Sequence, residues 1–498
     1  LALAPMPTQP VRVVVVGAGP SGLLACINFL NRNANSNDVT YHVTLVERGE
    51  DYGALDASGL EKKRSWMIGL STHGLTAIRR VPSLYEEYVS KVGVPVHATA
   101  LCVGSRKFEA KSDEIGENYV VDRNFVVAAI ARFLKDKFET SKYLTQRYNT
   151  KVNFVDSDER RIFVRDQNGR DEYIPYDLLI GCDGVRSQVR AALVANHRDF
   201  ESSVGDIFNR YKSVHIELPE HLDGNMIYIT PQVERLEFTD AAAELRAHPV
   251  RLYWRGMPWM GARRKTHGCL PNFNGIALPE TGGKVNLAMG CPTSAKVPAA
   301  LESDDVTAVA DYLRDNFKAF ALPFEAVAKQ WVAQPWNTTG MVHCNFYHSS
   351  TLRLAIMGDA AHATSPSIGQ GMNTALADAA AFDDLLDRHY DDIDAVLPAF
   401  SKERVKEGNA LTSIAYYVYP MSDFQNLRNT VVNILRNILH RYLPSLVAPD
   451  PLVSIGKGGK LSEAYAEMTR MGRLAAARRV NDDLRRGWFE KRVGLIKA

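Results

Sequence analysis

The chain has 498 residues, more than one ordinary domain holds, so we expect two or three domains. With 46% hydrophobic residues, 23% charged residues and a formal net charge of +2, the composition is typical of a globular protein and gives no sign of a nucleic-acid partner. Six scattered cysteines without a CxxC pair favour reduced thiols in an intracellular compartment, cytoplasmic or organellar. No stretch reaches the roughly 18 uninterrupted apolar residues of a spanning helix, and a start without an initiator Met leaves a removed targeting segment open.

The N-terminal segment predicts a nucleotide-binding βαβ unit. A β-branched run over residues 11–16 predicts a buried parallel strand, residues 23–30 predict a helix, and residues 41–46 predict a second strand. The loop between the first strand and the helix holds a G-x-G-x-x-G fingerprint: Gly17, Gly19, Pro20, Ser21 and Gly22. Its glycines permit the tight turn, the approach of a pyrophosphate and close helix packing, while the helix N-terminus offers N–H groups to the anion.

An acid follows the second predicted strand. Glu47 stands where it can accept hydrogen bonds from a ribose, and Arg48 comes next to it. Because a carboxylate suits a ribose hydroxyl and repels a 2′-phosphate, this position favours FAD or NAD over NADP.

The middle of the chain predicts two further parts. A helix is expected over residues 120–138, and a strand over 172–180 leads into Gly181-Cys-Asp-Gly184, which by itself is equally well a simple turn. From about residue 211 to 335, strand-like alternation over 212–217 and 225–230 with Pro and Gly turns predicts a mostly antiparallel sheet.

A second loop whose residues could bind a cofactor follows a strand predicted over residues 351–357. It holds Gly358, Asp359, Pro366, Gly369, Gly371, Met372 and Asn373. Asp359 can hold a ribityl hydroxyl or a water at a pyrophosphate. The helix predicted from about 372 to 389 can point its N–H groups at the N1 and C2 oxygen of a flavin, which carry negative charge after reduction.

The order of these three motifs resembles the group A FAD-dependent aromatic monooxygenases, which have the para-hydroxybenzoate hydroxylase fold. The resemblance spans almost the whole chain, and within the group it is strongest to the kynurenine 3-monooxygenases, on Arg64-Ser65, residues 70–74, Ala333-Gln-Pro335, residues 358–373 and Leu443-Pro-Ser445. It implies an α/β fold: a Rossmann-like FAD-binding domain of the GR2 type, a mostly antiparallel β-sheet substrate domain and a helical C-terminal region.

The domain boundaries expected from this resemblance divide the chain into four segments. Residues 10–210 and 336–397 form the FAD-binding domain, with some substrate-domain strands near 60–115; residues 211–335 form the substrate domain, and residues 398–498 the helical region.

The resemblance also implies the cofactors and the chemistry. NADPH or NADH reduces FAD, O2 adds to give a flavin C4a-hydroperoxide, and its distal oxygen attacks a small aromatic or other electron-rich substrate. Asp183 and Arg186 match the motif that touches FAD and the nicotinamide cofactor, and Arg123 matches an arginine near the flavin pyrophosphate. Arg64 is assigned to the cofactor site with them.

Two departures concern the substrate. Where the kynurenine enzymes carry a carboxylate-binding arginine shortly after a Pro, this chain has His97 and Thr99, and Ala377 replaces a family glutamate. Neither His97 nor Thr99 supplies the guanidinium that a bidentate clamp needs, so the sequence does not support kynurenine as the substrate.

The sequence assigns no catalytic acid or base and no metal. Asn373 and Tyr417 match family active-site positions and are the candidate substrate contacts. No second glycine fingerprint is visible for the nicotinamide cofactor, and Arg263-Arg-Lys265 is best interpreted as a solvated loop. Two alternatives remain: a reductase or dehydrogenase of the same fold without productive oxygen transfer, and a flavin-binding module without turnover.

Residues 424–443 predict a strongly amphipathic helix. The favoured interpretation is a helix packed over the substrate pocket or in a dimer contact. We accordingly expect the protein to be a monomer or a homodimer. Peripheral contact with a membrane surface is the alternative.

Overall fold

The computed structural model describes residues 9–35, 39–63, 65–103, 106–230, 274–292, 297–317, 322–417, 423–470, 472 and 474–475. Its first layer is a six-stranded sheet in the order β18-β19-β12-β1-β2-β8. The strands are β1 (Val11–Val16), β2 (Tyr41–Val46), β8 (Leu144–Arg147), β12 (Leu178–Gly181), β18 (His348–Ser349) and β19 (Leu354–Ile356). All neighbours pair in parallel except β18 with β19.

Helices cover this parallel sheet, which explains why β1 is apolar from Val13 to its end. Val13 to Val16 are at most 4% exposed, as a strand buried on both faces requires. Helix α1 (Pro20–Asn35) packs against α12 (Gly371–Arg388) and α5 (Arg123–Phe138). A small sheet of β9 (Thr150–Asp156), β10 (Arg161–Asp166) and β11 (Asp171–Pro175) adjoins one end, so the strand predicted over 172–180 is two strands, β11 and β12.

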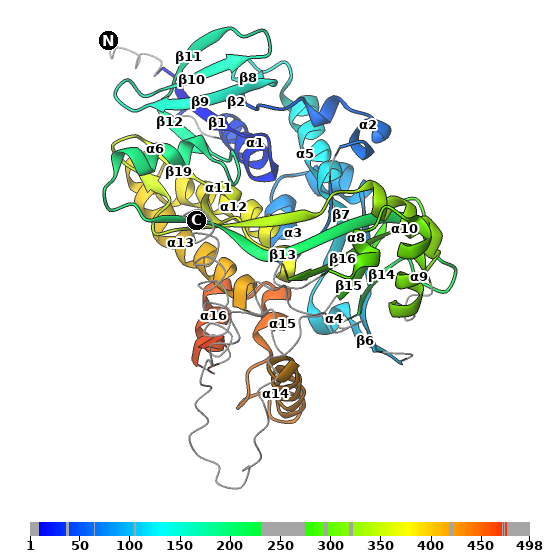
Figure 1. Ribbon diagram of the computed structural model, residues 1–498. Helices are drawn as coiled ribbons and strands as arrows, with labels where there is room; N and C mark the ends of the chain where they lie inside the picture. The colour runs from blue at the N-terminus through cyan, green and yellow to red at the C-terminus, as the bar shows by residue number, and fades with distance from the viewer. Residues whose placement is uncertain are drawn as a thin grey trace, which may run out of the picture.

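The second large layer is a seven-stranded sheet in the order β17-β13-β16-β15-β14-β5-β6. Its strands are β5 (Ala98–Val103), β6 (Arg106–Lys111), β13 (Ser202–Glu217), β14 (Met226–Thr230), β15 (Asn274–Glu280), β16 (Lys284–Pro292) and β17 (Asn337–Cys344). Figure 1 shows this sheet beside the parallel one, joined to it by the long strand β13. Strand β17, placed by sequence in the second part of the FAD-binding domain, pairs with β13 in this sheet.

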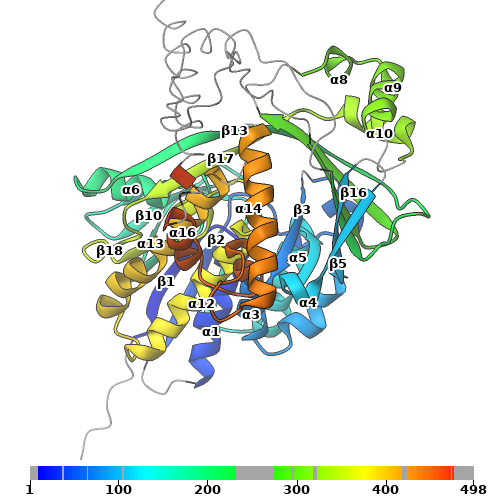
Figure 2. The same ribbon diagram turned by 90° about the horizontal axis from the view of Figure 1, so that it is seen from below.

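Three helices cover one face of the seven-stranded sheet: α8 (Ala299–Glu302), α9 (Val306–Asn316) and α10 (Phe324–Ala333), which lie together in Figure 2. Trp331 is fully buried among them and donates from Nε1 to the carbonyl of Leu301 at 3.0 Å, which ties α10 to α8. The other face meets a three-stranded sheet, β3 (Met67–Ser71), β7 (Asn118–Asp122) and β4 (Gly93–Val96), through a separate apolar cluster.

The C-terminal part is helical, as the sequence predicts. It comprises α13 (Ile393–Tyr417), α14 (Asp423–Tyr442), α15 (Pro451–Gly456) and α16 (Leu461–Arg470). Figure 1 shows α14 at the bottom of the molecule, away from both large sheets. Within the described ranges, no helix combines the length and apolar character needed to cross a bilayer.

Candidate active site

A cleft of about 530 Å³ opens at the carboxyl ends of β1 and β2. Ligands of open α/β sheets bind at such strand ends. The lining comes from the glycine loop, the end of β2, the N-terminus of α5, the β8–β9 connection and the loop after β12; it includes Gly17, Gly19, Glu47, Arg48, Arg123, Asp183 and Arg186. The structure thus brings these predicted cofactor residues to one cleft, whereas the predicted residues of the second loop, from Gly358 to Asn373, do not line it.

The three fingerprint glycines have different surroundings. Gly17 has φ +104°, and a Cβ there would lie 2.3 Å from the carbonyl oxygen of Cys182. A Cβ at Gly22 would lie 2.0 Å from the carbonyl oxygen of Gly17, so both positions need glycine for the backbone itself. A Cβ at Gly19 would meet no described heavy atom within 4 Å and would enter the cleft instead. Gly19 is therefore the position where a bound group can approach the backbone.

Glu47 holds two backbone segments of the cleft together. Its Oε2 accepts a hydrogen bond from the N–H of Ala18 at 2.7 Å, and its Oε1 accepts one from Gly49 at 2.7 Å. The carboxylate ties the end of β2 to the glycine loop, and its remaining lone pairs face the cleft that it lines.

Asp183 carries an unpaired polar atom in the cleft wall. Its Oδ2 accepts from the N–H groups of Gln188 at 2.6 Å and Val189 at 3.3 Å, at the start of α6 (Gln188–Asn196). Its Oδ1 is buried without a hydrogen-bond partner among the described residues, and burial raises the pKa of this carboxyl. A buried acceptor without a partner is costly, so this atom fits a hydroxyl donor of a bound cofactor.

Two arginines, Arg123 and Arg186, line the cleft. The Arg123 guanidinium lies 5.0 Å from the ring centre of Trp66, and Asp122 before it accepts from the N–H of Asn124 at 2.7 Å to begin α5. Arg186 is exposed at the loop after β12. Arg64 lies outside the described residues.

The second loop is held by a buried carboxylate that the sequence did not single out. Asp378 of α12 is fully buried; its Oδ2 accepts from the N–H of Gly358 at 2.9 Å and contacts His362 Nε2 at 2.5 Å, while its Oδ1 accepts from Arg404 Nε at 2.7 Å. Despite burial, the charges and hydrogen bonds of His362, Arg404 and Gly358 lower the pKa of Asp378 to about 2. The loop leading into exposed Asp359 is therefore anchored through its backbone.

The sequence around Asp378 does indicate that this residue is unusual. Asp378 stands in an alanine-rich stretch of α12, and an acid there is expected to be buried and paired. Its partners come from α11 (Asp359–His362) and α13, which no local pattern identifies.

The start of α12 is tied to β3 by Asn373. Its Oδ1 accepts from the N–H of Ser71 at 2.9 Å, and its Nδ2 donates to the carbonyls of Gly69 and Gly369, each at 2.8 Å. Both amide hydrogens are thus used within the protein, and contact with a substrate stays a prediction. Gly369 has φ +65° before the helix, and Pro366 lies in the preceding turn, with Gly371 and Met372 in the first turn of α12. The side chain of Tyr417 lies outside the described part.

The exposed face of α14 differs from the expectation of a helix packed over the pocket. Its apolar residues are 47% to 55% exposed, namely Val431, Ile434, Leu435, Ile438 and Leu439. Arg436 instead turns inward and pairs with Glu467 at 3.0 Å. Among the described residues, no group of three His, Cys, Asp or Glu side chains is arranged to hold a metal.

The cleft fits FAD, because the open backbone at Gly19, the carboxylate of Glu47, Asp183 with its unpaired buried oxygen, and the N-terminus of α5 all line it. The sequence profile of the FAD binding domain family matches residues 10–235 and 291–414, and the chain belongs to this family. It is an FAD-dependent monooxygenase, similar over most of its length to enzymes with that activity.

Curated relatives cover most of the chain. Violacein synthase of Chromobacterium violaceum is 27% identical over 451 residues, which cover 88% of this chain and 92% of the relative. Kynurenine 3-monooxygenase of Neurospora crassa is 24% identical over 506 residues, with 93% and 89% covered, and that of Sus scrofa is 25% identical over 457 residues, with 89% and 83% covered.

Solved structures support the fold. The tetrameric form of 2-methyl-3-hydroxypyridine-5-carboxylic acid oxygenase has a TM-score of 0.58 at 16% identity, covering 84% of this chain and 92% of its own. Klebsiella pneumoniae HpxO complexed with FAD and uric acid has a TM-score of 0.53 at 17% identity, with 95% and 96% covered. The expected α/β fold, with an FAD-binding domain, a β-sheet domain and a helical C-terminal region, is confirmed.

Proposed function

We propose that the protein hydroxylates a small aromatic or other electron-rich molecule, with NADPH or NADH as reductant and O2 as oxygen source. Bound FAD would supply the electron transfer and oxygen activation. The relatives act on different compounds by their names, so they support the reaction type and leave the substrate open.

The chain's own residues would hold and polarise the cofactor. The glycine loop and the N-terminus of α1 would bind the pyrophosphate, Glu47 would bind a ribose, and Asp359 would bind a hydroxyl of the ribityl chain. The N-terminal N–H groups of α12 would stabilise negative charge on the bound flavin.

The observation that carries the proposal is an apolar interface beside the cleft. Met67 of β3 and Val120 of β7 pack with Ile227 of β14, and all three are at most 8% exposed. Strand β7 ends at Asp122, directly before the cleft residue Arg123. Oxygen transfer needs a site from which water is excluded, and we propose that the substrate lies at the edge of this closely packed interface, whose buried side chains would keep water out. A reductase or dehydrogenase would need no such enclosure against water, and it is the alternative that the test must exclude.

Kynurenine is not the substrate we propose. His97 lies between β4 and β5, half exposed, with its Nε2 3.4 Å from Asp223 Oδ2. The segment therefore places an acid, not a guanidinium, beside His97, and a substrate carboxylate would be repelled there.

The test is NADPH and NADH oxidation by the FAD-loaded protein against a panel of phenols, anilines and aromatic acids, with products identified by mass spectrometry. A hydroxylated product in amounts close to the nicotinamide consumed supports the proposal. Oxidation that yields H2O2 or a reduced compound, with no hydroxylated product from any panel member, supports the alternative.

We also propose that the outward apolar face of α14, over residues 431–443, contacts a membrane surface peripherally. The inward turn of Arg436, which also donates from Nε to the carbonyl of Ala448 at 2.9 Å, leaves the apolar side outward. Sedimentation with phospholipid vesicles would test this, with Leu435→Ser as the variant. If the wild type instead forms a homodimer in the absence of vesicles, and Leu435→Ser is a monomer, the apolar face of α14 is a self-association surface.

A further inference from the structure

An apolar row crosses four strands of the seven-stranded sheet. Ile276 on β15 stands opposite Ile229 on β14, and Ile229 stands opposite Leu101 on β5. Leu101 in turn stands opposite Phe108 on β6, which is the edge strand of the sheet. Residues that stand opposite one another on neighbouring strands point to the same face, so these four side chains form one row. At the usual spacing of strands, the apolar row is about 14 Å long from β15 to β6.

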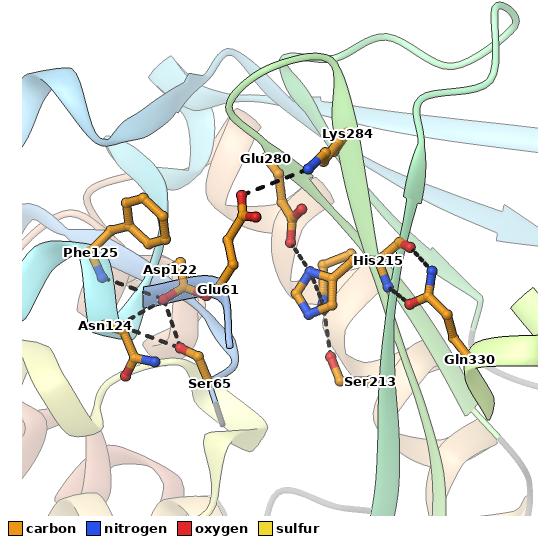
Figure 3. Close-up of polar contacts among 11 residues, drawn as sticks. Glu61, Ser65, Asp122, Asn124, Phe125, Ser213, His215, Glu280, Lys284 and Gln330 are labelled. Carbon is orange, nitrogen blue, oxygen red and sulfur yellow. Dashed lines mark hydrogen bonds and ion pairs between the residues drawn. The ribbon is translucent and has the colours of Figure 1, made fainter. Parts of the chain in front are cut away.

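The apolar row lies on the face of the sheet that is turned toward the FAD-binding side. Ile276 shares this face with Glu280, because alternate residues of a strand point the same way. Figure 3 shows Glu280, in contact with His215, on the side of the sheet turned toward Asp122. Asp122 directly precedes the cleft residue Arg123. The opposite face of the same strands packs into the core beneath α8, α9 and α10.

The side chains of the apolar row become more exposed from β15 to β6. Ile276 and Ile229 are partly buried and pack against the interface of Met67 with its neighbours. Leu101 is 40% exposed and Phe108 is 56% exposed. The row therefore leads from the interface at whose edge we propose that the substrate lies to the open edge of the sheet.

The sequence of β6 separates apolar from charged side chains. Phe108 and Ala110 share the face of the apolar row, whereas Lys107, Glu109 and Lys111 point to the opposite face. Lys107 pairs with Glu109 at 2.9 Å on that opposite face. The solvated face of an antiparallel sheet ordinarily carries polar side chains. An exposed phenylalanine beside an exposed leucine on one face therefore indicates contact with an apolar partner.

The neighbouring described side chains on this face are uncharged. Ile227, Thr99 and Ala110 stand opposite one another on β14, β5 and β6. Thr99 belongs to the segment in which the kynurenine enzymes carry an arginine, so these side chains offer no guanidinium to a substrate carboxylate. Their surface suits a hydrocarbon instead.

The gradient of exposure distinguishes between possible occupants. A membrane surface or a second copy of the chain would reach only the exposed end of the apolar row, at Leu101 and Phe108. A chain attached to the substrate would also cover the partly buried end, at Ile229 and Ile276, because the row is continuous with the interface beside the substrate. An extended alkyl chain has the shape and the chemistry to follow the whole row.

We infer that the aromatic substrate carries an alkyl chain, which lies along Ile229, Leu101 and Phe108 while the ring lies at the buried end of the apolar row. Leu101 and Phe108 determine the preference for chain length. This inference rests on the proposed function and narrows its substrate class to aromatic compounds with a hydrocarbon side chain.

A binding experiment tests this without turnover. The FAD-loaded protein is titrated with 4-methylphenol, 4-butylphenol and 4-octylphenol, and isothermal titration calorimetry gives each dissociation constant. The variants are Leu101→Ser, Phe108→Ser and the double variant. Phe154→Ser is the matched control, since Phe154 is a 45% exposed phenylalanine on strand β9. Leu435→Ser controls for binding of the alkyl chain to α14, and FAD absorbance and the melting temperature confirm that each variant is folded and loaded.

In the wild type and both controls, 4-octylphenol should bind about 100-fold more tightly than 4-methylphenol, about twofold for each added methylene, as half-burial of the chain implies. The double variant should lower this ratio to about tenfold, and each single variant should lower it less, because part of the apolar surface that buries the chain is lost. The dissociation constant of 4-methylphenol should be the same in all of these proteins.

An unchanged ratio in the double variant, an equal reduction in Phe154→Ser or Leu435→Ser, or no dependence on chain length would overturn the inference. Failure of all three probes to bind would do the same. A double variant that loses self-association or vesicle binding while keeping the ratio would assign the apolar row to that contact instead. Hydroxylation of short-chain panel compounds would in each of these cases leave the proposed function standing.

Discussion

The carboxylate of Asp378 accepts a hydrogen bond from the backbone N–H of Gly358 at 2.9 Å, which ties the loop that carries Asp359 to α12. Gly358 has φ +58° and ψ −139°, a conformation that residues with a Cβ rarely adopt. The same carboxylate joins α11, α12 and α13 through His362 and Arg404. The position of Asp359, which we propose as a cofactor residue, thus depends on buried ion pairs of Asp378.

Asp378→Asn should weaken FAD binding by about tenfold or more and lower the free energy of unfolding by about 3–5 kcal/mol, because it leaves the charge of Arg404 unpaired and buried. Fluorescence titration of the apoprotein with FAD, well below its melting temperature, measures the first effect. Asp387→Asn is the control, since Asp387 lies on the same helix, 64% exposed, and pairs with Arg32. Equal FAD affinity in all three proteins would show that Asp378 serves stability alone.

The low pKa of Asp378 predicts that the protein loses stability in acid. Its folded pKa, about 2, lies below the ordinary value of 3.8, so its contribution to stability is complete above about pH 4 and is lost as the pH falls toward 2. Urea unfolding of the wild type should show a decline in stability over this window that is smaller in Asp378→Asn. Parallel declines in both proteins would contradict the assignment.

Gly19→Ala should affect FAD affinity, whereas Gly22→Ala should affect the stability of the fold. An alanine Cβ at Gly19 enters the cleft without a clash, so the protein should fold normally and lose FAD affinity. At Gly22 the Cβ would lie 2.0 Å from a carbonyl oxygen, so this variant should lower the melting temperature strongly or fail to fold. Thermal unfolding of the apoproteins distinguishes them, and similar destabilisation by both would count against a bound group at Gly19.

Asp183→Asn should leave the apoprotein as stable as the wild type or make it more stable at neutral pH. Burial raises the pKa of Asp183, so the contribution of its neutral form to stability is lost as the pH rises through the folded value, and an amide removes that dependence. FAD should nevertheless bind more weakly, because the amide nitrogen is a donor in place of the unpaired oxygen acceptor of this cleft-lining residue. A less stable apoprotein with unchanged FAD affinity would refute both statements.

Local patterns explain what the sequence predicts well. Gly17, Gly19 and Glu47 belong to one short βαβ unit, so their spacing alone predicts that they lie at one cleft. Strands β5 and β6 join a sheet whose other members follow a hundred residues later. Pairing at such a distance leaves no periodic trace, so the expectation of substrate-domain strands near residues 60–115 came from the family resemblance alone.

The same limit applies to the site. Asn373 was interpreted as a substrate contact from its position in a motif, whereas its bonds to Gly69 and Ser71 follow from the packing of β3 on α12. His215 and Glu280 lie on strands β13 and β15, separated by β16, and their pairing depends on the register of all three. Residues in one motif can be predicted together; residues that meet through tertiary packing cannot.

The most direct test of the central claim is turnover under isotopically labelled O2, with mass spectrometry of the product formed from a phenolic panel and NADPH or NADH. The account predicts one labelled oxygen atom on the aromatic ring for each nicotinamide oxidised in coupled turnover. Substrate-dependent oxidation of the nicotinamide without any label in the organic product would contradict it and identify the protein as a reductase or dehydrogenase of this fold.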